Sequence, residues 1–304
     1  MPRTQDIHIR DPFVVPVPEE GYYYLFGTTD PDCWNPPGIG FDCYRSRDLD
    51  DWEGPIQAFR PPEGFWADRN FWAPEMHPYE GAYYLFATFK AENAFRGTQI
   101  LRAERPEGPY LPHSPEPVTP RNWECLDGTL HVEDGTPWIV FCHEWLQVHD
   151  GAICACQLSP DLRERVGRPI YLFNASEASW VRNIRPAAAY PCYVTDGPFL
   201  HRMQSGDLLM LWSSMAKQGY AMAVARSESG RIAGPWQQSD TPLWDADGGH
   251  GMIFRTFAGN LMLTLHSPNG NPSDGPIERP VFVPIEERDG DLACITQGLR
   301  SENA

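Results

Sequence analysis

The chain has 304 residues, of which 41% are hydrophobic and 12% aromatic, so it can bury a large core and is neither disordered nor fibrous. Its formal charge of −17 argues against nucleic acid as a partner, because phosphate binding needs a basic surface. No stretch approaches the roughly 20 apolar residues that cross a bilayer, and the first residues include no apolar segment typical of a signal peptide. We therefore expect a cytoplasmic protein without membrane partners.

Five stretches of the sequence follow one pattern, in which a polar or aromatic residue beside Gly or Pro precedes two short strands separated by a turn. The first is "DPFVVPVPEEGYYYLFGTT" (11–29), and the second is "FWAPEMHPYEGAYYLFATF" (71–89). The others are "CLDGTLHVEDGTPWIVFCHEW" (125–145), "TDGPFLHRMQSGDLLMLWSS" (195–214) and "GGHGMIFRTFAGNLMLTLHS" (248–267). A third strand often follows, as in "AVARSESGRIAGPW". The chain is thus an array of similar β units.

The spacing of these units predicts the architecture. They start at Asp11, Trp72, Asp127, Asp196 and His250, at intervals of roughly 55 to 70 residues, and no helical pattern recurs between them. Such repeats are typical of propeller blades, and the 31 Pro and 26 Gly supply the turns. We predict an all-β, five-bladed β-propeller with a central active-site channel, formed by residues 1–304 as one domain. A β-sandwich or two stacked β domains is the alternative.

The end of the chain bears on how the ring closes. The segment "ERPVFVPIEERDGDLACI" (278–295) reads as further strands. We expect the closing blade to take strands from both ends of the chain, with these strands meeting the N-terminal one.

The unit starts also predict a site. In a propeller the first strand of each blade lines the axis, so Asp11, Asp127, Asp196 and His250 are expected to face one another at one mouth of the channel. Carboxylates gathered in an apolar pocket repel one another and lose solvation, which separates their pKa values. One protonated and one ionised carboxyl are the acid and base of a glycosidase. An Asp at a strand start also has a simpler interpretation as a turn residue.

Several motifs resemble glycoside hydrolase family 43 in order and spacing across the whole chain: "IRDPFV", "FWAPEM", "LDGTLHVEDGTPWIV", "TDGPFL" and "GGHGM". The resemblance implies a five-bladed propeller that hydrolyses arabinose- or xylose-containing glycans with inversion. It also implies that Asp11 is the general base and that Asp127 orients and tunes the acid. His250 would lie on the axis, where many relatives hold a calcium ion through water. No organic cofactor is implied.

The acid departs from the family pattern, which has Glu before Gly-Pro where this chain has Asp196. The side chain is one methylene shorter, and a misplacement of about 1 Å can lower the rate on the order of a hundredfold. Glu144 in "FCHEWLQ" is therefore an alternative acid, or else a substrate-binding or buried carboxylate. Glu75 in "WAPEM" is a weaker candidate of the same kind.

Other residues are expected to bind substrate. Trp34, Phe71 and Trp72 lie in Pro- and Gly-rich stretches at the predicted mouth, where flat rings can stack on sugar faces, although each ring alone is more often part of a core. His143 lies beside Glu144, and Arg279 in "IERPVF" is expected either to reach the pocket from the last blade or to be solvated.

These features together predict an inverting glycosidase of the α-L-arabinofuranosidase or β-xylosidase type. Its expected partner is a short oligosaccharide, since polymers do not enter the cytoplasm. Two alternatives remain at this point: a galactofuranosidase of the same fold, and a propeller that binds carbohydrate without cleaving it because the usual acid Glu is replaced by Asp196. Neither the sugar nor the oligomeric state can be inferred from the sequence.

Overall fold

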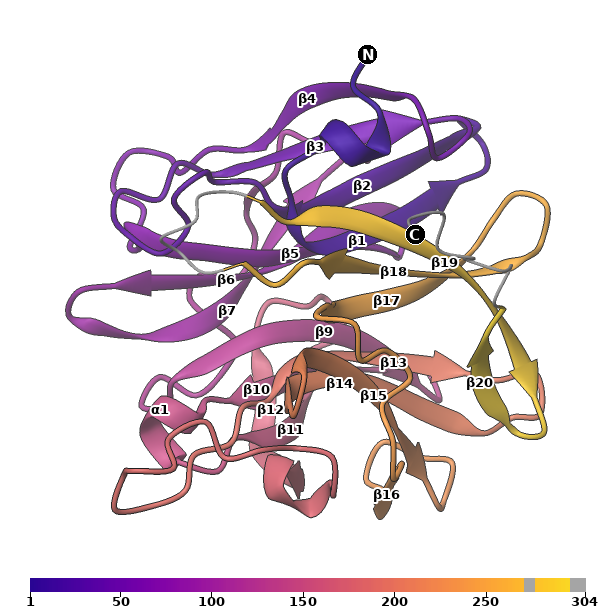
Figure 1. Ribbon diagram of the computed structural model, residues 1–304. Helices are drawn as coiled ribbons and strands as arrows, with labels where there is room; N and C mark the ends of the chain where they lie inside the picture. The colour runs from indigo at the N-terminus through magenta and orange to yellow at the C-terminus, as the bar shows by residue number, and fades with distance from the viewer. Residues whose placement is uncertain (271–276, 296–304) are drawn as a thin grey trace.

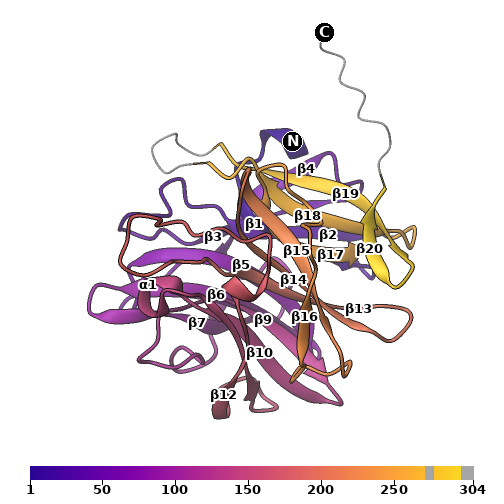
Figure 2. The same ribbon diagram turned by 60° about the horizontal axis from the view of Figure 1, so that its bottom comes forward.

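The computed structural model describes residues 1–270 and 277–295, and these form five four-stranded antiparallel sheets arranged around one axis (Figures 1 and 2). Each sheet consists of four strands that are consecutive in the chain, with the first strand at one edge and the fourth at the other. Each sequence repeat therefore forms one blade. The predicted five-bladed β-propeller is confirmed, and the β-sandwich is excluded.

Blades 1 and 2 contain β1 (Arg10–Val17), β2 (Tyr22–Thr28), β3 (Phe41–Ser46), β4 (Trp52–Phe59), β5 (Arg69–Tyr79), β6 (Ala82–Ala91), β7 (Ala94–Ala103) and β8 (Leu111–Pro112). Blade 3 contains β9 (Cys125–Glu133), β10 (Thr136–His143), β11 (Ala152–Leu158) and β12 (Arg165–Asn174). Blades 4 and 5 contain β13 (Asp196–Arg202), β14 (Leu208–Ala216), β15 (Gly219–Ser227), β16 (Trp236–Gln238), β17 (Gly249–Arg255), β18 (Leu261–Ser267), β19 (Arg279–Arg288) and β20 (Asp291–Cys294). The helical segments described are η1 (Thr4–Asp6), α1 (Trp145–Val148) and η2 (Ala175–Glu177).

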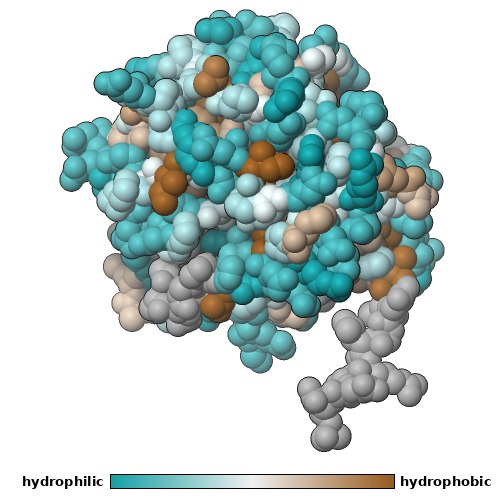
Figure 3. All heavy atoms as spheres, turned by 90° about the horizontal axis from the view of Figure 1, so that it is seen from above, coloured by the Kyte–Doolittle hydropathy of each residue, from teal (hydrophilic) through white to brown (hydrophobic). Residues whose placement is uncertain are grey.

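The hydrophobic core lies between the blades. The second strand of each blade is buried along nearly its whole length, because neighbouring blades cover both of its faces. This burial explains why these strands read as uninterrupted apolar runs such as "YYLFATF" and "LLMLW" instead of alternating patterns. The face in Figure 3 is mostly hydrophilic, with separate hydrophobic residues. Among the described residues, no helix is long and apolar enough to cross a membrane.

A β-bulge occurs at the same place in the first strand of every blade. In each case one residue pairs with the second strand, two residues then pass without a partner in the ladder, and pairing resumes three residues later. The first residue of each bulge has a positive φ, between 44° and 56°, a left-handed conformation that non-glycine residues adopt at some cost. These residues are Asp11, Ala73, Asp127, Gly197 and His250. A Pro or Gly follows each of them.

The register corrects one feature of the sequence interpretation. Asp11, Asp127 and His250 occupy the left-handed position, whereas Asp196 and Trp72 lie one residue earlier, in the last pair before the bulge. The five unit starts are therefore not equivalent residues. In blade 4, Gly197 takes the left-handed position at no steric cost, and Asp196 enters the site from the neighbouring position.

Hydrogen bonds between blades hold these bulges in place. The backbone N–H of a bulge residue donates to a side chain on the second strand of the preceding blade: Ala73 to Thr28 at 2.8 Å, and Asp127 to Thr88 at 2.9 Å. His250 donates in the same way to Ser213 at 2.8 Å. Each first strand is thus tied to the blade before it by a donor that the bulge has freed from the ladder.

The ring closes through side chains and backbone, without a shared sheet. The Asp11 N–H donates to Nδ1 of His266 on β18 at 3.1 Å, Ile9 donates to the carbonyl of Glu278 at 3.3 Å, and Arg10 pairs with the Glu278 carboxylate. In the described residues, no sheet combines strands from the two ends. The expected mixed closing blade is therefore wrong: β19 lies next to blade 1 in Figure 1 but pairs with β18 and β20.

The inter-blade bonds predict a stability difference between two buried threonines. Thr88→Val removes the acceptor of the buried Asp127 N–H, so the free energy of unfolding should fall by about 1 to 3 kcal/mol in urea titrations. Thr264 of β18 is a matched control, since its side chain is equally buried but its hydroxyl has no partner among the described residues. Thr264→Val should cost nothing. Equal losses in both variants would contradict this role of the hydroxyl.

Candidate functional site

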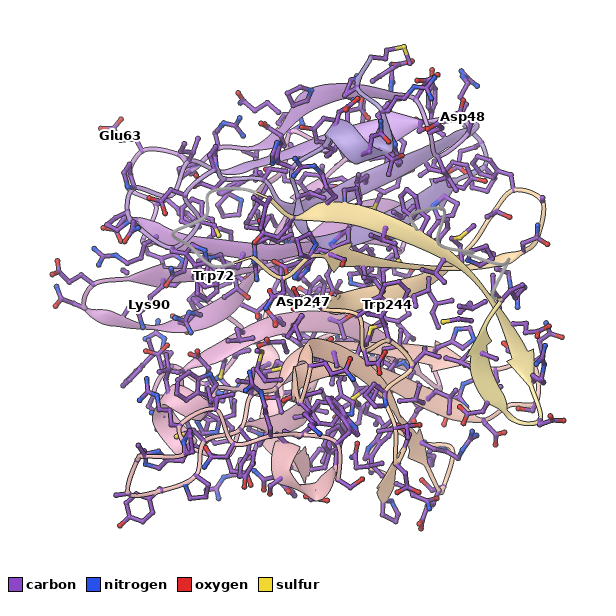
Figure 4. All side chains as sticks on the ribbon, viewed as in Figure 1. Asp48, Glu63, Trp72, Lys90, Trp244 and Asp247 are labelled. Carbon is purple, nitrogen blue, oxygen red and sulfur yellow. The ribbon has the colours of Figure 1, made fainter. Side chains whose placement is uncertain are left out.

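A cavity of about 440 Å³ lies where the first strands of the blades begin. Residues from all five blades line it: Arg10, Asp11, Cys33, Trp34, Asn70, Trp72, Arg96, Leu126, Asp127, Glu144, Trp145, Leu146, Val194, Asp196, Tyr220 and His250. In Figure 4, Trp72 lies on the same side of the molecule as Lys90 and the β6–β7 connection, away from Asp48. The three aspartates and the histidine that start four of the units therefore meet in one cavity.

Asp11 is surrounded by groups that favour its ionised form. Thr28 donates to its Oδ2 at 2.7 Å, and Nδ1 of His250 lies 3.1 Å from its Oδ1. Burial raises the pKa of this carboxyl, but His250, His266 and Arg10 together with the Thr28 hydroxyl lower it further than burial raises it. The net pKa lies below the usual range, so Asp11 is a carboxylate at neutral pH and has the charge required of a base.

The pKa of Asp127 is shifted upward, opposite to that of Asp11. Burial, together with the charges of Asp196 and Asp11, raises the pKa of its carboxyl to about 8, although His250 and the Gly197 N–H oppose the rise. That N–H donates to Oδ2 of Asp127 at 3.0 Å, across the contact between blades 3 and 4. Asp127 is therefore largely protonated at neutral pH.

The pKa of Asp196 is also shifted upward. Burial raises the pKa of its carboxyl, Asp11 adds to the rise, and His250, Arg10 and a hydrogen bond from Tyr220 oppose it. The Tyr220 hydroxyl donates to Oδ2 of Asp196 at 3.0 Å. One cavity thus contains a carboxyl whose pKa is lowered and another whose pKa is raised, the directions of shift that suit a base and an acid.

His250 interacts with the carboxylates directly. Its Nδ1 lies 3.1 Å from Asp11 and 3.7 Å from Asp127. Burial lowers the pKa of the imidazole, but the three aspartates raise it above its usual value. Among the described residues, no group of three or more His, Cys, Asp or Glu is arranged to hold a metal ion. Calcium prefers six to eight oxygen ligands, and these residues do not supply such a set. The calcium ion on the propeller axis stays a prediction.

Two tryptophans form an aromatic wall of the cavity. The rings of Trp34 and Trp72 meet edge to face with centroids 5.2 Å apart, and the Trp72 N–H donates to the carbonyl of Cys33 at 2.7 Å. Arg10 lies over the Trp34 ring at 5.0 Å, and Arg96 lies over the Trp72 ring at 4.5 Å. The structure thus places Trp34 and Trp72 at the cavity, as the sequence predicts, with one guanidinium against each ring.

Glu144 also lines the cavity, and it forms an ion pair with Arg96. Burial raises the pKa of its carboxyl while Arg96 lowers it, and the net shift is upward. The ion pair occupies one oxygen of Glu144 and holds Arg96 against Trp72. This contact favours a binding role over an acid role, because protonation of Glu144 would weaken the pair. Glu75, by contrast, is buried beside His77, 3.2 Å from its Nε2.

Three predicted contacts are not at the cavity. Phe71 is fully buried and packs edge to face on Phe89 with centroids 4.9 Å apart, because its side chain points into the core of blades 1 and 2. His143 stacks on Trp123 at 4.2 Å and contacts Gln147 at 2.8 Å. Arg279 bonds to the carbonyl of Gln5 and lies 2.7 Å from Nδ1 of His8, in the N-terminal segment. In the part of the chain that the structure describes, these three side chains are therefore not among those that line the cavity.

The sequence analysis missed Arg10, Arg96, Tyr220 and His266. Arg10 directly precedes Asp11, so "RDP" contains a signal for it. Tyr220 and Arg96 lie at the beginning of third strands, whose starts follow no recurring motif. Pairing along the blade brings them to the cavity, and that pairing is visible only in the fold.

Comparison with known proteins gives one consistent result. The family model described as glycosyl hydrolases family 43 matches residues 6–291. A solved endo-arabinase from Bacteroides thetaiotaomicron is 39% identical, with a TM-score of 0.88 over 96% of this chain and 99% of that one. An α-L-arabinofuranosidase from Lactobacillus brevis is 19% identical, with a TM-score of 0.74 over 94% and 93% of the two chains, and shows likeness of fold. No curated protein matched the sequence.

The raised pKa of Asp127 predicts a pH effect on stability. Between its usual value of 3.8 and about 8, the folded protein holds a proton that the unfolded chain has released, so this group makes stability fall as pH rises. Asp127→Asn removes that proton, while the amide oxygen can still accept from Gly197. The variant should lose less unfolding free energy than the wild type between about pH 4 and about pH 8 in urea titrations. An unchanged slope would show that Asp127 is ionised throughout.

Proposed function

Because this chain belongs to glycosyl hydrolases family 43, we propose that it removes arabinofuranosyl or xylosyl residues from short oligosaccharides with inversion of configuration. The observation that carries the proposal is the opposite shift of two pKa values in one cavity, downward for Asp11 and upward for Asp196. A site with one ionised and one protonated carboxyl can activate water and protonate a leaving group in the same step.

The proposed reaction uses both carboxyls at once. The carboxylate of Asp11 accepts a proton from water, and the water oxygen forms a bond to the anomeric carbon. The bond from that carbon to the glycosidic oxygen breaks, its electron pair stays on the oxygen, and Asp196 donates a proton there. Afterwards Asp11 is protonated and Asp196 is ionised, and exchange with solvent restores both. An inverting geometry requires these carboxyls to lie roughly 6.5 to 9.5 Å apart.

The other groups are proposed to support this step. Asp127, which accepts the Gly197 N–H, would orient the backbone beside Asp196. His250 lies beside Oδ1 of Asp11 and Thr28 donates to Oδ2, so the two groups would hold the carboxylate in place for the attacking water. Both roles are positional and electrostatic, and neither requires bond formation to the sugar.

The substrate class rests on the cavity and on one relative. A volume of about 440 Å³ is within the roughly 300 to 1,000 Å³ of small-molecule pockets and suits a short oligosaccharide. Trp34 and Trp72 offer faces and edges to a sugar ring, and the Arg96–Glu144 pair offers hydrogen bonds to hydroxyl groups. The 39% identical relative is described as an endo-arabinase, which favours arabinose over xylose.

The first test separates turnover from binding. Wild-type protein should release nitrophenol from an α-L-arabinofuranoside or a β-xyloside, and NMR of the first product should show the inverted anomer. Asp11→Asn should lower kcat by roughly three orders of magnitude or more, because water activation is needed only in the transition state. Calorimetry should show nearly unchanged affinity for an arabinose- or xylose-containing oligosaccharide.

Three results would contradict this proposal. Turnover of a galactofuranoside alone would change the sugar, and a retained anomer would exclude water as the direct attacker. A wild type that binds such an oligosaccharide but hydrolyses no member of the glycoside panel across about pH 4 to 8 would leave a binding site without the proposed chemistry.

The second test assigns the acid. Asp196→Ala should slow hydrolysis of substrates with poor leaving groups by about a hundredfold or more, and affect activated aryl glycosides much less, because only the former need a proton. Glu144→Gln should mainly raise KM, since it weakens the pair with Arg96 and leaves Asp196 in place. The reverse pattern in the two variants would assign the acid role to Glu144.

A further inference from the structure

Tyr220 is a buried tyrosine whose hydroxyl reaches one of the reacting carboxyls. It is the second residue of β15, the third strand of blade 4, and it lines the cavity. Its hydroxyl donates to Oδ2 of Asp196 at 3.0 Å. Burial raises the pKa of the phenol well above its usual value, so the hydroxyl keeps its proton and acts as a donor.

The ring of Tyr220 is fixed on several sides. It stacks on His266 with centroids 5.6 Å apart and planes inclined by 19°. A Cβ at Gly249 would lie 2.7 Å from the ring, so glycine at that position leaves the space that the ring fills. On the backbone, Tyr220 donates to Oδ1 of Asp247 at 3.3 Å and accepts from Gly248 at 3.0 Å. These contacts direct the hydroxyl to one place.

We propose that Tyr220 is a positioning residue that sets the acidity of Asp196 and determines which of its oxygens carries the transferable proton. The inference rests on the proposed role of Asp196 as general acid. Because the phenol donates to Oδ2, this oxygen acts as the acceptor, and the proton of the neutral carboxyl is on Oδ1. Oδ1 is then the atom that donates to the glycosidic oxygen.

The same hydrogen bond becomes stronger during the reaction. As Oδ1 releases its proton to the leaving oxygen, negative charge develops on the carboxylate, and the bond from Tyr220 becomes charge-assisted. The phenol therefore stabilises the product form of the acid more than the starting form, which is the condition for lowering a barrier. It also opposes the burial that makes Asp196 a weak acid.

Other charged or titratable groups face Asp196 from neighbouring elements, and they remain when Tyr220 is changed. They are Arg10 and Asp11 on β1, Asp127 on β9, Cys142 on β10, Glu144 at the end of β10, and His250 on β17. In the described residues, the Tyr220 hydroxyl is hydrogen-bonded to none of these side chains. A change in acidity after removal of that hydroxyl alone is therefore due to the lost hydrogen bond.

Tyr220→Phe tests the proposal because it keeps the ring on His266 and removes only the oxygen. The kcat on substrates with poor leaving groups should fall about tenfold or more, and the alkaline limb of the kcat/KM profile should move up by about one pH unit. Activated aryl glycosides should be much less affected. Tyr110→Phe is the matched control: this buried hydroxyl donates to the carbonyl of Pro106 at 2.7 Å, and its loss should move neither quantity.

A titration without substrate separates this inference from the proposed function. Carbon-13 NMR of labelled aspartate carboxyls, with the Asp196 signal assigned by its loss in Asp196→Asn, should show a higher pKa of Asp196 in Tyr220→Phe than in the wild type. If no glycoside is hydrolysed, the proposed function fails while this measurement still decides the role of Tyr220. An unchanged pKa of Asp196, or a fall in kcat with the alkaline limb unmoved, would overturn the proposal.

Discussion

The site depends on one backbone constraint, the left-handed residue that begins the bulge in each first strand. A non-glycine residue at this position is strained, and the strain persists because its N–H has a fixed acceptor on the preceding blade, such as Thr88 for Asp127 or His266 for Asp11. The bulge breaks the alternation of the strand, so the side chain turns toward the axis. The contacts that join neighbouring blades therefore also direct side chains into the cavity.

The three carboxyls differ in pKa because their surroundings differ. Asp11 has two imidazoles, a guanidinium and a hydroxyl close to it, and these outweigh its burial. Asp127 and Asp196 are also enclosed, but each faces other aspartates, and the pKa of both carboxyls is raised. Chemically identical side chains thus acquire different charges, because the fold gives each one different neighbours.

Much of the fold and of the cavity lining was predictable from the sequence. The features that were not predictable were missed for physical reasons. The repeated turn-and-strand pattern predicted five blades, and the motifs around Asp11, Asp127 and Asp196 indicated residues that do meet in one cavity. The one-residue offset of Asp196 was not predictable, because an Asp before Gly and an Asp before Pro look alike until the ladder fixes their register. The predicted position of Phe71 at the cavity was wrong, because an aromatic residue beside a bulge can point to either side of the sheet.

One contact between blades 3 and 4 involves a carboxyl of the cavity, that of Asp127. Where the other blades offer a hydroxyl or an imidazole to the next bulge, blade 3 has the thiol of Cys142, and the Gly197 N–H turns to the carboxyl of Asp127 instead. Asp127 therefore has a structural role beside the catalytic role proposed for it. A descendant that had lost all hydrolytic activity would still be under selection to keep an oxygen acceptor here. Retention of this residue in a relative is therefore poor evidence that the relative is an active enzyme.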